Sequence, residues 1–433
     1  MVLAVAIFFA KHSISQEKKM LTLKEAIDLS IQNSKQLKAA RARIDATLAQ
    51  IKEAEDNRLP GFNISGSYLR LSSANIDIKT KSANPGTIPA ASPKISQALY
   101  GIANLSFPVY SGGKIKYGIE AAKYLSEAAK LDAANNKESV ILNTLNAYAN
   151  LYKSAATISI ITESLMSSRQ RDTTFYRFEQ NGLLARNDLL KAELQTSNIE
   201  LALLDAENNW KLANINMNLM LGLPESTELI IDTTAFRQVT SIKNIDEYEQ
   251  LAIQNRKDIQ ALNYRKKAAA VAIKSANTEA YPNIALTGGY VAAYVPNIIT
   301  ITNALNVGIG VQYNLASLWK TNTKLQQAKA KEKELQANEG ELNDAIRLQI
   351  NQDYQNYLLS QKRIEVYQKS LQQATENFRI TKNKYDNSLV TVTELLDADV
   401  ALTQAKLNLS ISKADAILAY NKLLYTTGLL SAQ

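Results

Sequence analysis

"NLSFPVYSGGKIKYGIEAAKYLSEAAKL", residues 104–131, passes from strand-like alternation through a turn with two glycines into a long helical segment. A glycine-rich turn between a strand and a helix can cradle a phosphate on its backbone N–H groups. The P-loop pattern requires a glycine five residues before Gly113 and a Ser or Thr after Lys114, but Pro108 and Ile115 stand there. The spacing therefore argues against a nucleotide site and favours a turn that simply joins a strand to a helix.

The composition argues against most enzymes. The 433-residue chain has no cysteine and one histidine, His12, so thiolate or histidine-based metal and catalytic sites lack their residues. The net charge is +8, but 49 basic residues are interspersed with 41 acidic ones and form no sustained basic block. We therefore expect no enzymatic activity, no cofactor, no metal site and no nucleic-acid partner. With only 15 glycines and 8 prolines, long uninterrupted elements are expected.

The N-terminus has an apolar run from Val2 to Ala10, which is too short to span a bilayer as a helix and suits the core of a signal peptide. Cleavage before Gln16 would make residues 1–15 the signal, with a truncated start because basic residues ahead of the run are missing. An apolar strand or buried helix is the alternative. Beyond residue 16, no stretch reaches the roughly 18 apolar residues of a membrane helix, so any span is expected to be β.

The chain repeats itself. "LSIQNSKQL" at 29–37 corresponds to "LAIQNRKDI" at 251–259, and "FPVYSGGK" at 107–114 corresponds to "YNLASLWK" at 313–320. These matches run in the same order across helices, strands and turns, which favours two copies of one unit over chance similarity between helices.

Each copy reads as helix, strand, loop, strand, long helix and shorter helix. A loop rich in Ser, Ala, Asn and Pro is predicted from Ser72 to Gln97. The predicted organisation is a first repeat at 16–224 with strands about 61–72 and 98–110 and helices about 114–180 and 187–220, a linker at 225–244, and a second repeat at 245–429 with strands about 284–295 and 305–315 and helices about 320–386 and 393–425.

The strand and helix lengths together predict the fold class. Strands of about ten weakly alternating residues match tilted transmembrane β-strands. Helices of about 67 residues would reach ~100 Å and must pack as coiled coils with others. Four strands are too few for a closed barrel, which needs about eight. We therefore expect an α+β membrane protein with an internal repeat, a trimer in which a 12-stranded β-barrel continues into a long α-helical barrel.

Several motifs of this chain resemble those of one known family. The duplicated strand starts "LPGF" and "YPNI", with "FPVYSGGKI", "RFEQNGLLARNDLLKAE" and "KYDNSLVTVTELLDAD", resemble the TolC-like outer-membrane efflux proteins over nearly the whole mature chain. The resemblance implies a Gram-negative outer-membrane location, contact with outer-membrane lipid and a large periplasmic portion. Gly112 and Gly113 would then serve the turn between barrel and tunnel.

The implied function is a passive exit duct in a tripartite efflux or type I secretion system. A homotrimer would work with a periplasmic adaptor and an inner-membrane pump of the RND, ABC or MFS type. It would export small molecules, drugs, metal ions or polypeptides. The alternative function is a coiled-coil periplasmic adaptor or scaffold, which the helices alone would permit. The paired strands ahead of the long helices argue against that alternative.

The resemblance also assigns residues at the periplasmic tip. Its two turn motifs fall on Gly182 and Leu183 in the first copy and on Ser388 and Leu389 in the second. Family members hold the tunnel closed through contacts among a tyrosine, an aspartate and an arginine near these turns.

The tyrosine and aspartate of these gating contacts correspond to Tyr385 and Asp188. The arginine position falls on Val390, and Phe178 lies one residue farther from its turn than the pattern expects. Arg186 is a candidate substitute, and an ordinary solvated arginine is the alternative.

The entrance constriction is assigned to Glu394 and Asp397. They lie three residues apart and so share one helix face. The resemblance places both inward at the tunnel entrance, where threefold symmetry would stack two acidic rings. Two ordinary solvated carboxylates are the alternative.

Overall fold

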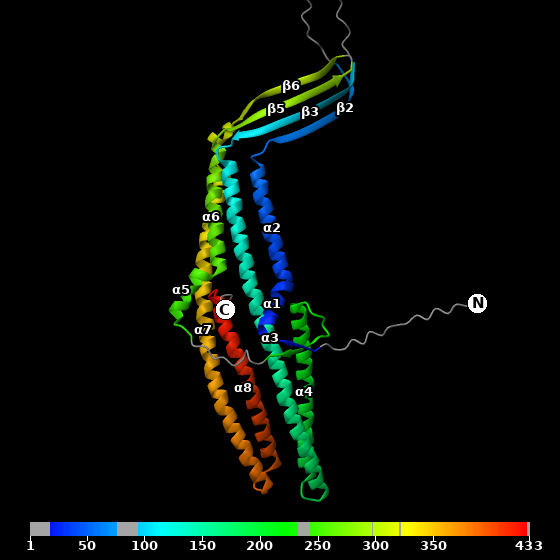
Figure 1. Ribbon diagram of the computed structural model, residues 1–433, viewed down its shortest axis with the longest axis vertical. Helices are drawn as coiled ribbons and strands as arrows, with labels where there is room; N and C mark the ends of the chain where they lie inside the picture. The colour runs from blue at the N-terminus through cyan, green and yellow to red at the C-terminus, as the bar shows by residue number, and fades with distance from the viewer. Residues whose placement is uncertain (1–17, 76–93, 233–241, 297, 320–321, 431–433) are drawn as a thin grey trace, which may run out of the picture. The chain divides into compact units, whose positions relative to one another are not determined.

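The computed structural model describes residues 18–75, 94–232, 242–296, 298–319 and 322–430. The signal peptide predicted at 1–15 lies outside these residues. Long helices dominate the described residues (Figure 1), which also contain six strands. In the described part of the chain, no helix is both long enough and apolar enough to cross a membrane.

The helices are α1 (Leu23–Asn33), α2 (Lys35–Asp56), α3 (Lys114–Gln180), α4 (Arg186–Leu221), α5 (Ile245–Asn255), α6 (Lys257–Asn277), α7 (Thr323–Asp386) and α8 (Val392–Thr426). The strands are β1 (Lys18–Leu21), β2 (Gly61–Asn75), β3 (Lys94–Tyr110), β4 (Glu228–Ile231), β5 (Asn283–Val295) and β6 (Ile299–Gln312). Two 3-10 helices cover Thr278–Ala280 and Leu315–Leu318.

The chain divides into two compact units. The first takes the described residues of Met1–Ala42, Leu131–Ile259 and Gly340–Gln433, and the second takes those of Arg43–Lys130 and Gln260–Glu339. Each unit therefore draws on both halves of the chain. The boundary between the units falls within continuous helices, because α2, α3, α6 and α7 each contribute residues to both.

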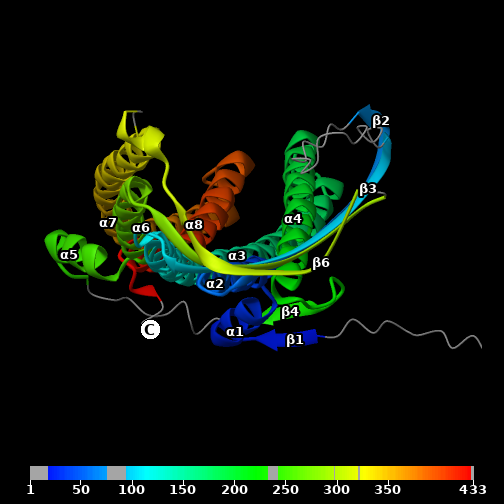
Figure 2. The ribbon, with the colours of Figure 1, turned by 90° about the horizontal axis from the view of Figure 1, so that it is seen from above.

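The second unit holds a four-stranded antiparallel sheet in the order β2-β3-β5-β6, which Figure 2 shows as a curved layer. The central pair, β3 and β5, joins strands from different halves of the chain. β2 and β6 are the edge strands, and neither has a second strand partner among the described residues. The sheet therefore presents two open edges.

The loop between β2 and β3 is shorter than the sequence analysis expected. Ala74 pairs with Ile95 and Asn75 with Lys94, so both ends of the predicted loop from Ser72 to Gln97 belong to strands. Residues 76–93 of that loop lie outside the described residues. β6 likewise begins at Ile299, earlier than the expected start near 305, because the β-branched run from Ile299 to Thr302 suits a pleated sheet.

Helical segments of the second unit follow the order α2, α3, α6, α7. The Thr47 hydroxyl on α2 donates to the Ser126 hydroxyl on α3 at 3.2 Å. The ring centroids of Tyr124 on α3 and Tyr264 on α6 lie 6.2 Å apart. Lys266 on α6 pairs with Glu339 on α7 at 2.6 Å. Each helix thus has its sequence-distant neighbour fixed by side-chain contacts.

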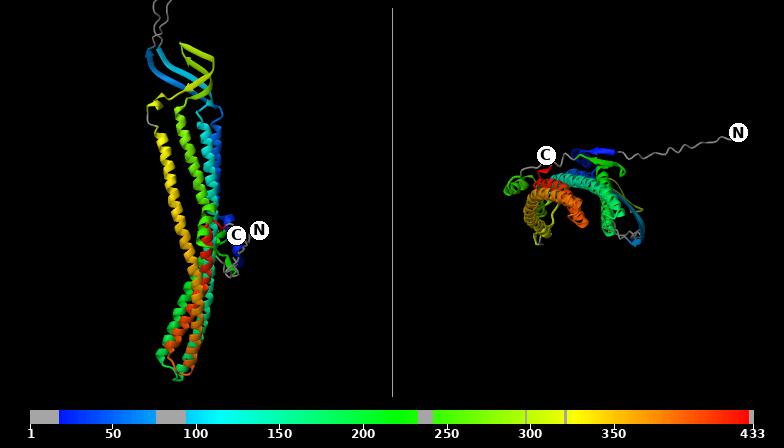
Figure 3. Two further views of the ribbon diagram at one scale, coloured as in Figure 1. Left: turned by 90° about the vertical axis from the view of Figure 1, so that its left-hand side faces the viewer. Right: turned by 90° about the horizontal axis from the view of Figure 1, so that it is seen from below.

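The first unit contains a curved row of helices in the order α4, α3, α8, α7 (Figure 3). Glu163 on α3 pairs with Lys406 on α8 at 2.9 Å. Asp353 on α7 pairs with Lys422 on α8 at 3.0 Å. A polar network described below joins α3 to α4. The outer helices of this row, α4 and α7, therefore each have a long helical neighbour on one side.

The main core of the first unit surrounds a two-stranded parallel sheet of β1 and β4 that the sequence analysis missed. The predicted linker at 225–244 thus contains a strand, β4, which pairs with the N-terminal β1 in the register Lys18↔Glu228. Both strands were missed in the sequence because each has only four residues, too few to show the alternation that marks a strand. The fully buried Tyr148 on α3 places its hydroxyl 3.0 Å from the Leu21 carbonyl oxygen and 2.9 Å from that of Asp232.

We predict that Tyr148→Phe weakens the attachment of the β1–β4 sheet to α3, which we call the Tyr148 anchor. Loss of a buried hydroxyl that serves two carbonyls should lower the free energy of unfolding by about 1–3 kcal/mol. Urea unfolding followed by circular dichroism measures it, and Tyr176→Phe is the control because that ring is 53% exposed. Equal midpoints for Tyr148→Phe and the wild type would contradict the anchor role.

The same variant has a pH signature. Burial raises the pKa of Tyr148 well above its usual range, and the nearby carboxylate of Asp232 raises it further. The stabilisation is therefore fully present below about pH 10 and is lost as the pH rises beyond the ionisation of the unfolded chain. On raising the pH above about 10, the free energy of unfolding of Tyr148→Phe should therefore fall less than that of the wild type.

Candidate functional site

One face of the four-stranded sheet is apolar and open. Its side chains project from alternate positions of all four strands, and on β6 the side chain of Val307 is 84% exposed. The exposed apolar residues of this face are Phe62, Ile64, Tyr68, Leu99, Leu105, Phe107, Leu286, Tyr294, Leu305, Val307, Ile309 and Val311. An apolar surface of this extent on a water-soluble monomer would be unusual.

The opposite face of the sheet is small and polar near its centre. Asn63, Asn104, Gly289 and Asn306 lie in register across the four strands. A Cβ at Gly289 would lie 3.2 Å from the amide oxygens of Asn104 and Asn306, so the glycine leaves room for both amides. An open sheet with one apolar and one polar face suits a wall between an apolar phase and water.

The turn from β3 into α3 needs its two glycines. Gly112 and Gly113 have φ values of +61° and +91°, in the left-handed region that glycine tolerates best. A Cβ at Gly112 would also lie 2.8 Å from the Cβ of Tyr281. The Lys114 N–H donates to the Ser111 carbonyl at 3.0 Å, which closes the turn locally.

The two tip turns, between α3 and α4 and between α7 and α8, have the same backbone construction. Gly182 and Ser388 adopt φ values of +69° and +58°. The Leu183 N–H donates to a carbonyl five residues earlier at 2.8 Å, and the Leu389 N–H does the same at 2.8 Å. Leu183 is 75% and Leu389 72% exposed, so each turn presents an apolar side chain to its surroundings.

Behind the turns, a small apolar cluster packs the four helices together. Its buried members are Phe175, Leu189, Ala192, Val392, Leu395 and Leu396, with Leu184, Phe378 and Tyr385 packed against it. The rings of Phe175 and Tyr385 lie 5.6 Å apart. Burial raises the pKa of Tyr385, and the nearby carboxylates of Asp188 and Asp386 raise it further. The predicted tyrosine thus lies in this cluster with Asp188 close by.

The other predicted gating residues make mostly local contacts. The Asp188 carboxylate accepts a hydrogen bond from Lys191 in its own helix at 3.1 Å, and among the described residues no hydrogen bond joins it to Tyr385. Arg186 lies 3.9 Å from Glu179, an ion pair between α4 and the end of α3. Val390 is half-buried.

Glu394 and Asp397 lie in the first turns of α8, and both side chains are exposed. Glu394 also forms a capping box: its carboxylate accepts from the Thr391 N–H at 3.3 Å, and the Thr391 hydroxyl accepts from the Glu394 N–H at 3.3 Å. Glu394 therefore starts the helix as well as carrying a charge. Across the described ranges, no three His, Asp or Glu side chains gather as a metal site would require.

Sequence reasoning missed a polar seam between α3 and α8. Arg171 Nη1 lies 2.7 Å from Asp399 Oδ2, and both side chains are 10% exposed. Towards the β1–β4 sheet, the seam continues with the hydroxyl pair Ser164–Thr403 and the ion pairs Glu163–Lys406 and Lys153–Asp415. All these residues were visible in the sequence, but the antiparallel register that pairs them was not.

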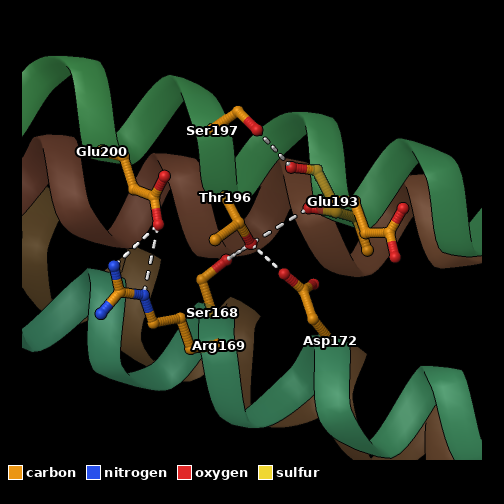
Figure 4. A network of polar contacts seen from close by, with 8 residues as sticks. Ser168, Arg169, Asp172, Glu193, Thr196, Ser197 and Glu200 are labelled. Atoms are coloured by element: carbon orange, nitrogen blue, oxygen red, sulfur yellow. Dashed lines mark hydrogen bonds and ion pairs between the residues drawn. The ribbon is translucent and has the colours of Figure 1, made fainter.

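A second polar network joins α3 to α4 (Figure 4). The Ser168 and Thr196 hydroxyls lie 2.6 Å apart, and Thr196 donates to Asp172 at 2.5 Å. Arg171 Nη2 donates to Ser168 Oγ at 3.0 Å, so the network and the seam meet at Ser168. In the part of the chain that the structure describes, Nε of Arg171 and Oδ1 of Asp172 are buried without a hydrogen-bond partner.

Comparison with known proteins gives consistent matches. The model of the outer membrane efflux protein family matches residues 26–223 and 249–429. Outer membrane protein TolC of Vibrio cholerae is 22% identical over 422 residues, which cover 95% of this chain and 91% of that protein.

Solved structures share the fold. The outer membrane protein VceC of Vibrio cholerae superposes with a TM-score of 0.77 at 19% identity, covering 94% of this chain and 96% of that one. A membrane protein from Pseudomonas aeruginosa gives a TM-score of 0.79 at 16% identity, covering 94% and 92%.

These findings confirm the resemblance seen in the sequence. The relatives are outer-membrane proteins, and the family is one of efflux channels, which favours transport over catalysis. The protein is accordingly assigned to the outer membrane. With both matched segments covering most of the chain, this protein belongs to the outer membrane efflux protein family.

Proposed function

We propose that the protein is the outer-membrane exit duct of a tripartite efflux or type I secretion system. Three copies would form a 12-stranded barrel in the outer membrane and a helical tunnel in the periplasm. Small molecules, drugs, metal ions or polypeptides would pass through it passively. The observation that carries the proposal is the open sheet, with one apolar face and one face of small polar side chains.

The sheet edges support closure by other copies. In a bilayer, unpaired N–H and C=O groups at a strand edge have no water to bind, so only closed barrels are stable there. One chain supplies four strands, with edges at β2 and β6. Pairing β6 of one copy with β2 of the next would satisfy both edges, and three such steps would close a ring of twelve.

The outer helix α4 of the first unit supports the same assembly. Six exposed leucines recur along it and, at ~100° per residue, fall within an arc of roughly 80°. They are Leu190, Leu194, Leu201, Leu204, Leu212 and Leu219. The buried residues of α4, such as Ala206 and Met217, lie on the opposite side of the helix. α4 therefore has a second apolar stripe that the helix row of its own copy leaves uncovered.

The helix at the other end of the row, α7, carries a matching stripe of Leu348, Leu359, Val366 and Ile380. In both helices the apolar residues recur at intervals such as 7 and 11, which suits coiled-coil packing. Contact between α4 of one copy and α7 of the next would be head-to-tail, and rotation by a third of a turn would close it.

The proposed internal duplication is supported by the helix ends. α4 ends at Leu221 and is followed directly by Gly222, and α8 ends at Thr426, two residues before Gly428; both glycines have φ of +71°. A Cβ at Gly222 would meet Asn33, and one at Gly428 would meet Asn255 and Arg256. Asn33 and Asn255 occupy matching positions in the two quoted repeat sequences.

The partners proposed are a periplasmic adaptor, an inner-membrane pump of the RND, ABC or MFS type, and outer-membrane lipid. The exposed turn leucines, Leu183 and Leu389, offer apolar contacts for an adaptor helix at the tip. The alternative, that this chain is itself an adaptor or scaffold, gives no account of a sheet that leaves its apolar face open.

At the entrance, we place Glu394 and Asp397 as two stacked acidic rings. Six carboxylates around a narrow opening would attract cations and repel anions. For the closed state, we propose that Tyr385 and Asp188, with Arg186 beside them, contribute to tip packing. The Tyr385 ring contact with Phe175 supports this role more strongly than the local ion pair of Asp188.

The assembly predicts the effect of charges in the leucine stripe. Leu201→Glu with Leu212→Glu should dissociate the oligomer in mild detergent, because each buried leucine contributes about 2 kcal/mol. Mass by size-exclusion light scattering is the measurement. Asn198→Glu with Asn209→Glu adds the same charges to exposed positions of α4 outside the stripe and should leave a trimer. A trimeric leucine variant would exclude this interface.

The entrance proposal predicts a cation-selective pore. Glu394→Gln with Asp397→Asn should remove most of the selectivity, since glutamine keeps the capping box while both charges are lost. Reversal potentials in asymmetric salt across planar bilayers report it. Removing two charges from α5, with Asp246→Asn and Glu247→Gln, is the matched control. An anion-selective wild type, or a selective double variant, would remove these residues from the entrance.

A further inference from the structure

We propose that the Arg171–Asp399 ion pair is the lock that keeps the tip of each protomer closed, an inference that rests on the proposed channel function. The helices of the first unit form two antiparallel pairs, α3 with α4 and α7 with α8, each joined by its own tip turn. Arg171 belongs to the first pair and Asp399 to the second. If one helix pair moves relative to the other, the contact between Arg171 and Asp399 must break, or the two side chains must move together.

Burial distinguishes this ion pair from the others that cross between α3 and α8. Both Arg171 and Asp399 are 10% exposed, whereas Glu163 of the Glu163–Lys406 pair is 66% exposed. Exposed ion pairs contribute little because water and salt screen them. A buried pair is costly to break by removing one partner, since a charge is then left without compensation. The lock therefore acts mainly through one contact in this seam.

The Arg171 guanidinium is held on the α3–α4 side through Ser168, whose hydroxyl contact with Thr196 is shown in Figure 4. One terminal nitrogen of Arg171 donates to Ser168, which contacts Thr196 of α4. The other contacts Asp399 of α8. Arg171 is thus fixed to the α3–α4 pair, and Asp399 is the partner that leaves when α8 moves.

The same network makes the lock releasable. Nε of Arg171 and Oδ1 of Asp172 are buried and have no hydrogen-bond partner in the described residues. Buried polar atoms without a partner are destabilising, because they lose the hydrogen bonds that water would supply. Opening the α3–α8 seam would hydrate the Arg171 guanidinium, including its Nε, together with the separated charges. The closed state is therefore stabilised by the ion pair and opposed by its incompletely bonded surroundings.

Among the described residues, the charged gating residues assigned by family resemblance form no ion pair that crosses to α7 or α8. Arg186 pairs with Glu179, and Asp188 with Lys191, so both ion pairs stay within α3 and α4. The position where the family places its arginine holds Val390. Tyr385 does reach across to α3, but through a ring contact. Arg171–Asp399 is the contact with both the charge and the burial that closure needs.

The test compares two arginines of one helix that lie two residues apart. Arg171→Gln breaks the contact to α8, whereas Arg169→Gln breaks an ion pair to α4, within the same helix pair. Single-channel conductance in planar bilayers is recorded for both variants and for the wild type. We expect Arg171→Gln and Asp399→Asn to shift the ratio of open to closed channels by at least about tenfold, with Arg169→Gln unchanged. Tyr385→Phe, which keeps its ring, should change the ratio less.

A reversible cross-link provides the second measurement. The chain has no cysteine, and the Ser164 and Thr403 hydroxyls lie 3.2 Å apart across the seam. In the Arg171→Gln background, Ser164→Cys with Thr403→Cys should return the conductance to the wild-type level under oxidation and release it on reduction. The charge-exchanged variant, Arg171→Glu with Asp399→Arg, should also recover closure in part.

The outcomes separate the two proposals. A wild-type protein that forms no channel contradicts the proposed function, whatever the variants do. A conducting wild type whose Arg171→Gln and Arg169→Gln variants behave alike overturns the lock and leaves the channel intact. If Arg171→Gln and Asp399→Asn both fail to assemble while Arg169→Gln assembles, the pair serves folding instead, and the lock is again overturned.

Discussion

Among the described residues, the four-stranded sheet has unpaired backbone groups at both of its edges, and in a membrane these edges require further strands to pair with them. β2 and β6 each form hydrogen bonds with only one neighbouring strand among the described residues. Apolar side chains alternate along the strands toward one face of the sheet, and they are exposed there. Neither condition is stable for an isolated chain in water or in lipid. A ring of copies that pair edge to edge in a membrane satisfies both conditions at once, and the outer-membrane efflux family provides the setting for it.

The helices meet a related constraint by similar means. A long helix, such as α3 with 67 residues, draws most of its stability from packing against other helices. The helix row of the first unit covers α3 and α8 on both sides but leaves a leucine stripe on α4 and an apolar stripe on α7. Polar contacts join α3 and α8 from Arg171 to Lys153, and apolar clusters pack the same two helices around Tyr148 and Leu145. In our proposal, the outer stripes serve assembly and the polar seam serves gating.

Much of the fold can be predicted from local patterns in the sequence, whereas the pairing of segments that lie far apart in the chain cannot. The absence of proline from Lys114 to Gln180 indicated a long helix, because proline is the strongest helix breaker. The placement of β3 beside β5 and the parallel pairing of β1 with β4 were not predictable, since each joins residues far apart in the chain. Arg171 was missed for the same reason: only the α3–α8 register brings it to Asp399. The capping box of Glu394 is readable in the sequence as Thr-x-x-Glu over residues 391–394.

We propose that one closed barrel is built from several copies of this chain. Cryo-electron microscopy of the wild-type protein in lipid nanodiscs tests it most directly, because the strands of the barrel can be counted in cross-section and traced to their chains. We expect a single ring in which each of three chains contributes its four strands, β2, β3, β5 and β6. A barrel closed by one chain, separate four-stranded sheets, or a ring with a different number of copies would contradict it.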